Sequence, residues 1–331
     1  AHGRCVDAVA SLARPASALD AVIVATMSKV SPEYAPAPPP ASPPFGVETA
    51  STEPKKTKDE FVFFGRVCAC VPEGWLSIID LLKQPISDRT FYPRKYLSAS
   101  HEVFGITLAL TWAITAIGWR HQFIEHPARP IIGSFNPCFG WDYYPGSHIA
   151  LVFCSVNVYL TWRYAWLEIT RTSLKRGGRA LQWQEWFATV SAILLAVASN
   201  VWLLLWSIGP NDGNWTGHTA IFVFYALSSY AAVLGNYLEV RATNRAEIRV
   251  RHTVFVALYA FAAVFLTTLY FTDIGTFVPC PWANATMITV SEQLECAPPI
   301  IPPWLTQTSD VLWMVCVILI TKFTPKDSAI V

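Results

Sequence analysis

The chain has 331 residues, of which 53% are hydrophobic and only 14% are charged. Average soluble domains carry roughly 25% charged residues, so the composition argues against an ordinary soluble domain. The formal net charge of +1 argues against a polyanionic partner such as a nucleic acid. The 14 tryptophans and 12 tyrosines suit a bilayer surface, where amphipathic rings collect. Together these features predict a protein that crosses a membrane several times.

The two ends of the chain are predicted to lie outside the membrane. Residues 1–60 are proline-rich and then charged, with too little apolar sequence for a core, so we predict a disordered cytosolic tail. The first methionine of the sequence is Met27, and we expect translation to begin there; a genuine N-terminal extension is the alternative. Residues 61–100 are predicted to form a juxtamembrane region, and residues 324–331 a cytosolic C-terminal tail.

The segment at residues 61–82 is apolar but interrupted by charges. A spanning helix would bury Arg66 and Glu73, at a cost of about 2.5–3.5 kcal/mol for each charge. We therefore predict an interfacial segment on the cytosolic face; an additional span would reverse the side of every later loop. Cys68 and Cys70 are candidates for palmitoylation, with ordinary packing as the alternative.

Further along the chain, six stretches are apolar over roughly the 20 residues that a helix needs to cross a bilayer. Each is too long for a barrel strand of about ten residues. They lie at residues 103–119, 148–169, 186–209, 218–238, 253–275 and 304–323. The predicted fold class is therefore all-α, a polytopic membrane bundle of six transmembrane helices within residues 101–323.

The distribution of basic residues predicts the orientation of this bundle. Two of the loops are strongly basic, and their cations are Arg171, Lys175, Arg176, Arg179, Arg241, Arg245, Arg249 and Arg251. The loops at 210–217 and 276–303 contain no lysine or arginine, although the first loop, 120–147, carries Arg120 and Arg129. Because basic loops stay in the cytosol, we place the basic loops and both termini there.

The loops placed outside contain residues that are modified in an oxidising lumen. Asn214 and Asn284 each begin an Asn-x-Thr sequon, the acceptor for N-glycosylation. Cys280 and Cys296 flank one stretch of a loop and are predicted to form a disulfide. Cys138 would then be left over, and a different pairing is the alternative.

Ionisable residues inside spans are the usual indicators of function in membrane proteins. Asp310 stands about two turns into the last span, and Asp273 lies near the outer end of the fifth. His148 and His218 begin two spans on the same outer face. These four residues are the candidate polar site, with a pH-sensitive contact between His218 and Asp310 as a specific hypothesis. The alternative is interfacial histidines and a buried aspartate that is hydrogen-bonded to its neighbours.

A cofactor or a catalytic centre is not the leading expectation. The sequence has no phosphate-binding glycine loop, no His-Glu-x-x-His and no Gly-x-Ser-x-Gly, so we predict no catalytic residue, no metal site and no cofactor. One alternative is a haem oxidoreductase, in which His148 and His218 would hold one haem near the outer face, and His101 and His252 another near the inner face.

Several short stretches resemble the DRAM/FRAG/Sfk-type family of six-span membrane proteins over roughly residues 101–325. The end of the second span reads YLTWRYAWLEI, similar to an exit motif of that family, and the last span ends LITKFTP. His218 begins the fourth span and Asp310 lies early in the sixth, as is usual there. The first outer loop lacks the family's acidic pair. It retains three of the loop's other positions: Pro130, Ile132 and Pro145.

This resemblance implies a non-enzymatic protein of an endomembrane (lysosome, Golgi or ER) or of the plasma membrane, which modulates lipid organisation, autophagy or membrane trafficking. Its expected partners are membrane lipids and, as an option, further copies of itself. A proton-coupled transporter or channel using the Asp310 region is the first alternative function, and the haem oxidoreductase is the second.

The charge asymmetry yields a test of topology. In a chain with reporter cysteines, one near Lys175 should react with an impermeant reagent from the cytosol, and one near Glu292 only from the other side, because the positive-inside rule separates these two loops. Labelling of both cysteines from the same side would contradict the six-span arrangement.

Overall fold

The computed structural model describes residues 72, 74–84, 91–176, 180–204, 215–275, 290, 294 and 299–325, without the side chains of 273–275. Every secondary-structure element longer than one residue in this part of the chain is a helix, which confirms the all-α prediction. The expectations for the 1–60 tail, for Cys68 and Cys70, for the two sequons and for the Cys280–Cys296 disulfide concern residues outside the described ones.

Six long helices form the main body of the described chain. They are α4 (Pro93–Gly118), α8 (Gly146–Arg176), α9 (Trp183–Trp202), α11 (Trp215–Thr243), α12 (Val250–Gly275) and α14 (Pro303–Phe323). Each packs on the next in this order, and α14 packs back on α4, so the helices close into a ring. Each helix begins before its predicted span, because backbone hydrogen bonding does not stop where the sequence becomes polar. The predicted span at 186–209 instead runs past Trp202, the last residue of α9.

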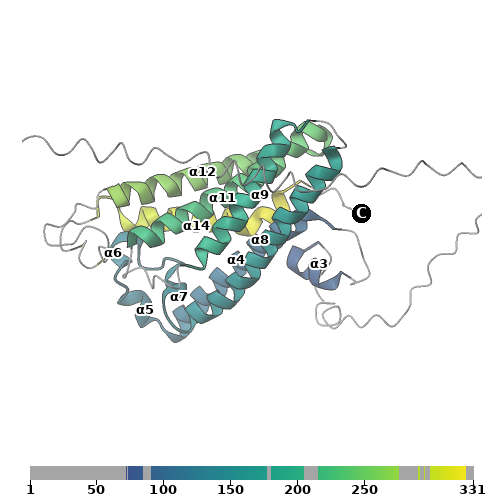
Figure 1. Cartoon of the computed structure of the whole chain (residues 1–331). Helices are drawn as coiled ribbons and strands as arrows, with labels where there is room; N and C mark the ends of the chain where they lie inside the picture. The colour runs from purple at the N-terminus through teal and green to yellow at the C-terminus, as the bar shows by residue number, and fades with distance from the viewer. Residues whose placement is uncertain are drawn as a thin grey trace, which may run out of the picture. The chain divides into compact units, whose positions relative to one another are not determined.

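Shorter helices lie at the ends of the ring. The connection between α4 and α8 folds into α5 (His121–Ile124), α6 (Arg129–Ile132) and α7 (Phe139–Asp142), which gather at one end (Figure 1). A 3-10 turn, η1 (Arg245–Glu247), joins α11 to α12 at the other end, on the side that the charges place in the cytosol.

Five helices of the described chain are long and apolar enough to cross a membrane: α4, α9, α11, α12 and α14, with a mean hydropathy of 1.3 to 2.1. The predicted span at 148–169, which lies in α8, does not reach this composition. Polar residues lower its hydropathy, among them Asn157, Arg163 and Glu168. By composition the structure therefore supports five spans where the sequence analysis predicts six.

The polar residues of α8 nevertheless face inward. Asn157 and Glu168 are buried against the other helices, whereas Val152, Tyr159 and Trp166 are exposed. The other helices of the ring likewise expose large apolar side chains. These are Ile106, Leu110, Leu194, Val197, Phe261, Val264, Val315 and Ile318. Soluble monomers rarely expose an apolar surface of this extent, and a bilayer is the medium that suits it.

A cluster of aromatic rings fills the centre of the bundle. Phe104 on α4 lies at its middle, stacked on Tyr225 with ring centroids 4.9 Å apart. Its ring also makes edge contacts with Trp141 at 5.1 Å and with Trp202 and Trp313 at 5.6 Å each. Edge-to-face pairs of this kind contribute about 0.5–1.5 kcal/mol each beyond the area they bury. Through these contacts Phe104 joins α4 to four other helices: α7, α9, α11 and α14.

The interfacial segment is represented by α3 (Ser77–Lys83), a helix of 7 residues. At about 1.5 Å per residue this described helix is far too short to cross a bilayer. The carboxylate of Glu102, a buried residue of α4, accepts hydrogen bonds from the backbone N–H groups of Ser77 and Ile78, each at 2.9 Å. Trp75 just before the helix is 63% exposed, which suits a residue that anchors the segment at a membrane surface.

A close approach of α9 and α11 depends on a glycine. A Cβ added to Gly235 would lie 2.8 Å from the backbone Cα of Ala188, closer than real Cβ contacts allow. Contacts between small residues let membrane helices pack backbone to backbone. A Cβ added to Gly118, at the end of α4, would meet nothing within 4 Å.

We therefore expect Gly235→Ala to destabilise the bundle by about 1–3 kcal/mol, because the two helix backbones must separate. The measurement is the midpoint of thermal unfolding of the purified protein in detergent. Gly118→Ala is the matched control and should have no destabilising effect; equal losses in both variants would show that the α9–α11 contact is not tightly packed.

Candidate functional site

Asp310 is a carboxylate buried among helices without a compensating cation. It lies on the inward face of α14 and is 2% exposed. Its Oδ2 accepts hydrogen bonds from Nδ2 of Asn136 and, at 2.9 Å, from the hydroxyl of Tyr270. Its Oδ1 is buried and has no hydrogen-bond partner, and no lysine, arginine or histidine of the described chain forms an ion pair with it. The negative charge of a carboxylate in this position must be neutralised, either by a proton or by a cation from outside the described residues.

The connection between α4 and α8 is folded so that Asn136 reaches Asp310. The backbone N–H of Phe135 donates to Oε1 of Gln307 on α14 at 3.4 Å. Gly133 has a φ of 89°, a conformation that favours glycine, and a Cβ there would collide with the Gln307 side chain. Asn136 itself is held by its Nδ2, which also donates to the Ile132 carbonyl, and by its Oδ1, which accepts from the Cys138 N–H at 2.9 Å.

Two small cavities, each with a volume of about 10 Å³, lie in this part of the bundle, and Asp310 lines the first of them. We call the first the Asp310 chamber; its walls are Asp310 with Phe104, Leu108, Pro137, Cys138, Trp141, Trp202, Phe222, Trp313 and Met314. We call the second the His218 chamber; its walls are His218 with Ile132, Cys138, Trp215, Thr219, Phe222 and Tyr270. Each space holds about one water molecule. The two chambers share Cys138 and Phe222, so they are neighbours.

A buried His–Asp pair stabilises the loop beside these chambers. Nδ1 of His126 accepts from the backbone N–H of Ala128 at 3.1 Å, so the ring proton resides on Nε2. Nε2 then donates to Oδ2 of Asp142 at 2.8 Å. The ring of His126 also stacks on Phe139 at 3.9 Å. This tautomer orients the imidazole and ties α7 to the start of α6, which keeps Cys138 and Asn136 in place.

Cys138 is held as the protonated thiol in this environment, and a thiol is a weaker nucleophile than a thiolate. Burial raises its pKa well above the usual value, and the negative charges of Asp310 and Asp142 raise it further. The reactive form of cysteine is the thiolate. All three described cysteines (Cys138, Cys154 and Cys316) are free thiols.

The structure brings together two of the four residues of the predicted polar site. His218 and Asp310 line neighbouring chambers, but no hydrogen bond or ion pair joins them, and Nδ1 of His218 has no partner. The hypothesised direct contact is therefore replaced by Tyr270, which lines the His218 chamber and donates to Asp310. His148 is exposed and lies beside Tyr144 and Ser147, outside both chambers. The side chain of Asp273 is outside the described residues.

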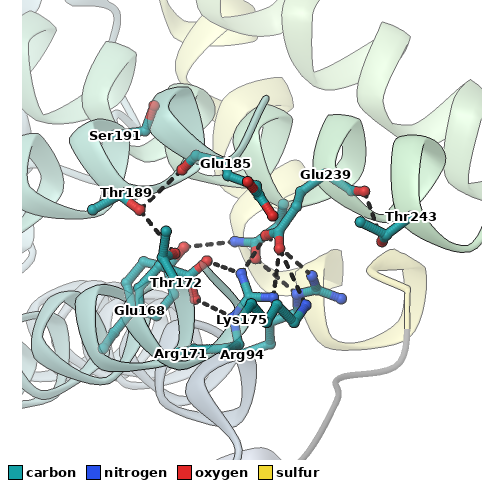
Figure 2. Close-up of polar contacts among 12 residues, drawn as sticks. Arg94, Glu168, Arg171, Thr172, Lys175, Glu185, Thr189, Ser191, Glu239 and Thr243 are labelled. Carbon is teal, nitrogen blue, oxygen red and sulfur yellow. Dashed lines mark hydrogen bonds and ion pairs between the residues drawn. The ribbon is translucent and has the colours of Figure 1, made fainter. Parts of the chain in front are cut away.

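A second polar cluster joins α8 to α11 and α4 (Figure 2). The guanidinium of Arg171 on α8 donates to Glu168, one turn earlier, and to Glu239 on α11, with Nη1 2.6 Å from Oε1 of Glu239. Lys175 Nζ lies 3.3 Å from the same oxygen, and Nη2 of Arg94 lies 3.8 Å from Oε2 of Glu239. Planar guanidinium groups bind carboxylates through pairs of hydrogen bonds, which makes this cluster specific in geometry.

The cluster continues through hydrogen bonds to uncharged side chains, and these bonds connect α4 to α11 and α8. Nε of Arg94, on α4, donates to Oδ1 of Asn236 at 2.7 Å. Nδ2 of Asn236 in turn donates to the hydroxyl of Tyr164 on α8 at 2.6 Å. Sequence reasoning missed this network, because Arg171 appears there as a loop charge and Glu239 as the end of a span. The spacing of Glu168 and Arg171 by three residues was the signal that could have been used.

A third buried network crosses the middle of the bundle. Nδ1 of His101 donates to the Leu97 carbonyl at 2.8 Å, so Nε2 accepts from the hydroxyl of Ser229 at 2.5 Å. Ser229 in turn accepts from the hydroxyl of Tyr259 at 2.7 Å. Both nitrogens of His101 are thus engaged, and this residue does not fit the role of an axial haem ligand. His101 lies inside α4 and is buried.

Comparison with known proteins adds no identification to this geometry. No protein-family model matches the chain, and neither a curated protein nor a solved structure shows significant similarity to it. The main indication of function is therefore the contrast between the paired charges around Arg171 and the uncompensated Asp310.

We expect removal of Arg171, the central cation of the second polar cluster, to be strongly destabilising. Arg171→Met should lower the free energy of unfolding by about 3–5 kcal/mol, because two buried carboxylates lose their main partner. The exposed Arg241, on the same end of the bundle, provides the control: Arg241→Met should stay within about 0.5 kcal/mol of the unmodified chain. Detergent-solubilised protein unfolded by heat gives the comparison, and similar midpoints for the two variants would assign the cluster no structural role.

Proposed function

We propose that this chain is a six-span integral membrane protein that modulates lipid organisation or membrane trafficking without catalysing a reaction itself. The observation that carries this proposal is the inverted bundle, which exposes large apolar side chains and buries its carboxylates, amides and hydroxyls. A surface of this kind contacts lipid over its whole circumference, so lipids are the molecules that the protein meets in greatest number.

The sixth span in this proposal is α8. It occupies a place in the ring between α4 and α9, and its outward face carries Val152, Tyr159 and Trp166. With six spans both termini lie in the cytosol, and the loops with Asn214, Asn284 and the Cys280–Cys296 pair lie in the lumen or outside the cell. Glycans at these sequons and the disulfide are part of this proposal, as is residence in an endomembrane or the plasma membrane.

The packing of the interior supports a lipid-related function over conduction. The Asp310 and His218 chambers each hold about one water molecule. Between them and the inner charge cluster lie the rings of Phe104, Tyr225 and Trp313, in contact with one another. In this conformation the described bundle therefore has a filled centre.

A proton-coupled transporter is the second candidate, and one observation favours it. Asp310 is a buried carboxylate with an unpaired oxygen, and such residues in membrane helices serve proton and ion relays. In this function Asp310 would gain and lose a proton as the outer loop and α14 move. The haem oxidoreductase has less support, since His101 is already bonded at both ring nitrogens.

The proposal predicts a lipid phenotype that depends on Asp310. In cells depleted of the protein, the distribution of lipids between membranes and leaflets, measured with headgroup-specific probes, should change. The full chain should restore it and Asp310→Asn should not, while Glu247→Gln, an exposed carboxylate on η1, should restore it fully.

The same variants separate the two candidate functions. In proteoliposomes with an internal pH dye, a proton flux that is lost in Asp310→Asn, together with unchanged lipid distribution in the depleted cells, would replace the lipid function by transport.

A further inference from the structure

The turn between α11 and α12 is strongly basic, and we call it the arginine turn. Its cations are exposed side chains at the end of α11, in η1, just before α12 and at the start of α12: Arg241, Arg245, Arg249 and Arg251. The same stretch contains a single acidic residue, Glu247, whose Oε1 accepts a hydrogen bond from Nδ2 of Asn244 at 2.7 Å. The arginine turn therefore carries a clear excess of positive charge.

Three of these arginines have no partner in the described chain. Nε of Arg251 lies 3.3 Å from Nε2 of the buried His252. The side chains of Arg241, Arg245 and Arg249 form no ion pair or hydrogen bond with any described residue. The guanidinium of Arg171 differs, since it is buried against two carboxylates. The arginine turn thus presents three guanidinium groups to whatever lies beside the bundle.

Hydrogen bonds give the arginine turn a defined shape. The backbone N–H of Asn244 donates to the Val240 carbonyl at 2.7 Å, and that of Ile248 donates to the Arg245 carbonyl at 3.1 Å. The hydroxyls of Tyr237 and Thr253, 2.8 Å apart, join α11 to α12 next to the turn. Because the backbone is already folded, a ligand of these arginines does not have to order a loop when it binds.

The packing of α9 on α11 places the arginine turn along the bundle. Trp202, at the end of α9, contacts Phe222 near the start of α11, with ring centroids 5.8 Å apart. Ala188, near the start of α9, lies against Gly235 in the second half of α11. The two helices are therefore antiparallel, and the start of α9 lies beside the end of α11.

This arrangement puts Arg241 level with an exposed tryptophan. At about 1.5 Å per residue, Trp183 lies about 7.5 Å from the Ala188–Gly235 contact toward the start of α9, and Arg241 about 9 Å from it toward the end of α11. Trp183 is 62% exposed. Exposed tryptophans of membrane helices lie at the level of the lipid headgroups. The arginine turn begins at this level.

An apolar stripe on α12 starts directly after the arginine turn. It consists of exposed side chains three or four residues apart, which share one face of the helix: Val254, Leu258, Phe261 and Val264. A phospholipid has the matching order of groups, a phosphate at the surface and acyl chains below it. Basic turn and apolar stripe are thus adjacent on one helix, as a bound lipid requires.

The chemistry of the turn selects the charge of that lipid. A guanidinium group binds two phosphate oxygens at once, and clusters of four or more basic residues beside a transmembrane helix attract anionic lipids. We propose that the arginine turn binds the headgroup of an anionic phospholipid, with its chains on the apolar stripe of α12. This inference deepens the proposed lipid function and rests on it for the side of the membrane, the cytosolic leaflet.

The first experiment measures lipid preference directly. The purified full chain is placed in nanodiscs with equal parts of phosphatidylserine and phosphatidylcholine, and the lipids retained by the released protein are weighed by native mass spectrometry. We expect phosphatidylserine to be retained preferentially, and less so as salt is raised, because exposed charges are screened. Equal retention of the two lipids would overturn the proposal. So would complete displacement of the lipid by an equal concentration of inorganic phosphate, which would make a free anion the ligand.

Variants assign the preference to the arginine turn. The triple change Arg241→Gln, Arg245→Gln and Arg249→Gln should reduce the preference for phosphatidylserine by about tenfold or more, since each basic residue at an anionic surface contributes roughly fivefold. Replacing the same three residues with lysine keeps the charge and should retain part of the preference. Arg120→Gln, an exposed arginine at the other end of α4, is the control and should leave it unchanged.

The unfolding midpoint of the triple glutamine variant should stay close to that of the unmodified chain, because the three side chains are exposed and unpaired. If that variant does not fold, Arg245→Gln is compared with Arg120→Gln instead, and equal preferences in these two would contradict the proposal, as would an unchanged preference in the triple variant. Absence of the preference leaves the lipid phenotype of depleted cells as it stands. A chain that retains phosphatidylserine yet has no such phenotype removes the proposed function and leaves this site.

Discussion

A charge that is buried away from water must be neutralised by an opposite charge or by hydrogen bonds inside the protein. The positions of the helices in this bundle depend on where its buried charges find such partners. At one end the guanidinium of Arg171 lies between Glu168 and Glu239, and Arg94 and Lys175 complete the set. The contacts join α4, α8 and α11, three helices that are distant in sequence. Because Arg94, Glu168, Arg171 and Glu239 are all buried, their contacts constrain the rotation of each helix about its own axis, whereas Lys175 is exposed.

At the other end the condition is met only in part. Asp310 receives two hydrogen bonds, from a loop amide and a tyrosine, but no cation of the described chain approaches it. Each end also relies on an asparagine: Asn236 extends the paired cluster, and Asn136 connects the outer loop to the unpaired carboxylate. The end with satisfied charges is suited to hold the helices together.

The middle of the bundle separates these two ends with aromatic packing and one short hydrogen-bond chain. The chain from Tyr259 through Ser229 to His101 directs every proton toward the Leu97 carbonyl, so none of its groups is left for a ligand. Around it, Phe104 and its neighbours fill the space. The rings that line the Asp310 chamber are thus part of the core.

The sequence alone predicted the all-α fold class and the positions of the long apolar helices, because long apolar runs have few other solutions; their closure into a ring is a tertiary result. It also indicated Asp310, since an acid inside an apolar helix is rare enough to be informative by itself. It did not determine the composition of the site. His148 and His218 share one predicted face, yet only His218 borders a chamber, and Asn136, Tyr270 and Trp313 come from positions with no local signal. Those residues meet Asp310 because α12, α14 and the first outer loop fold together. The same holds for Glu239 and Arg171, 68 residues apart. A periodic pattern reports which side of a helix is apolar, whereas the partner of a buried polar atom depends on helix rotation and loop path, and only the tertiary structure decides these.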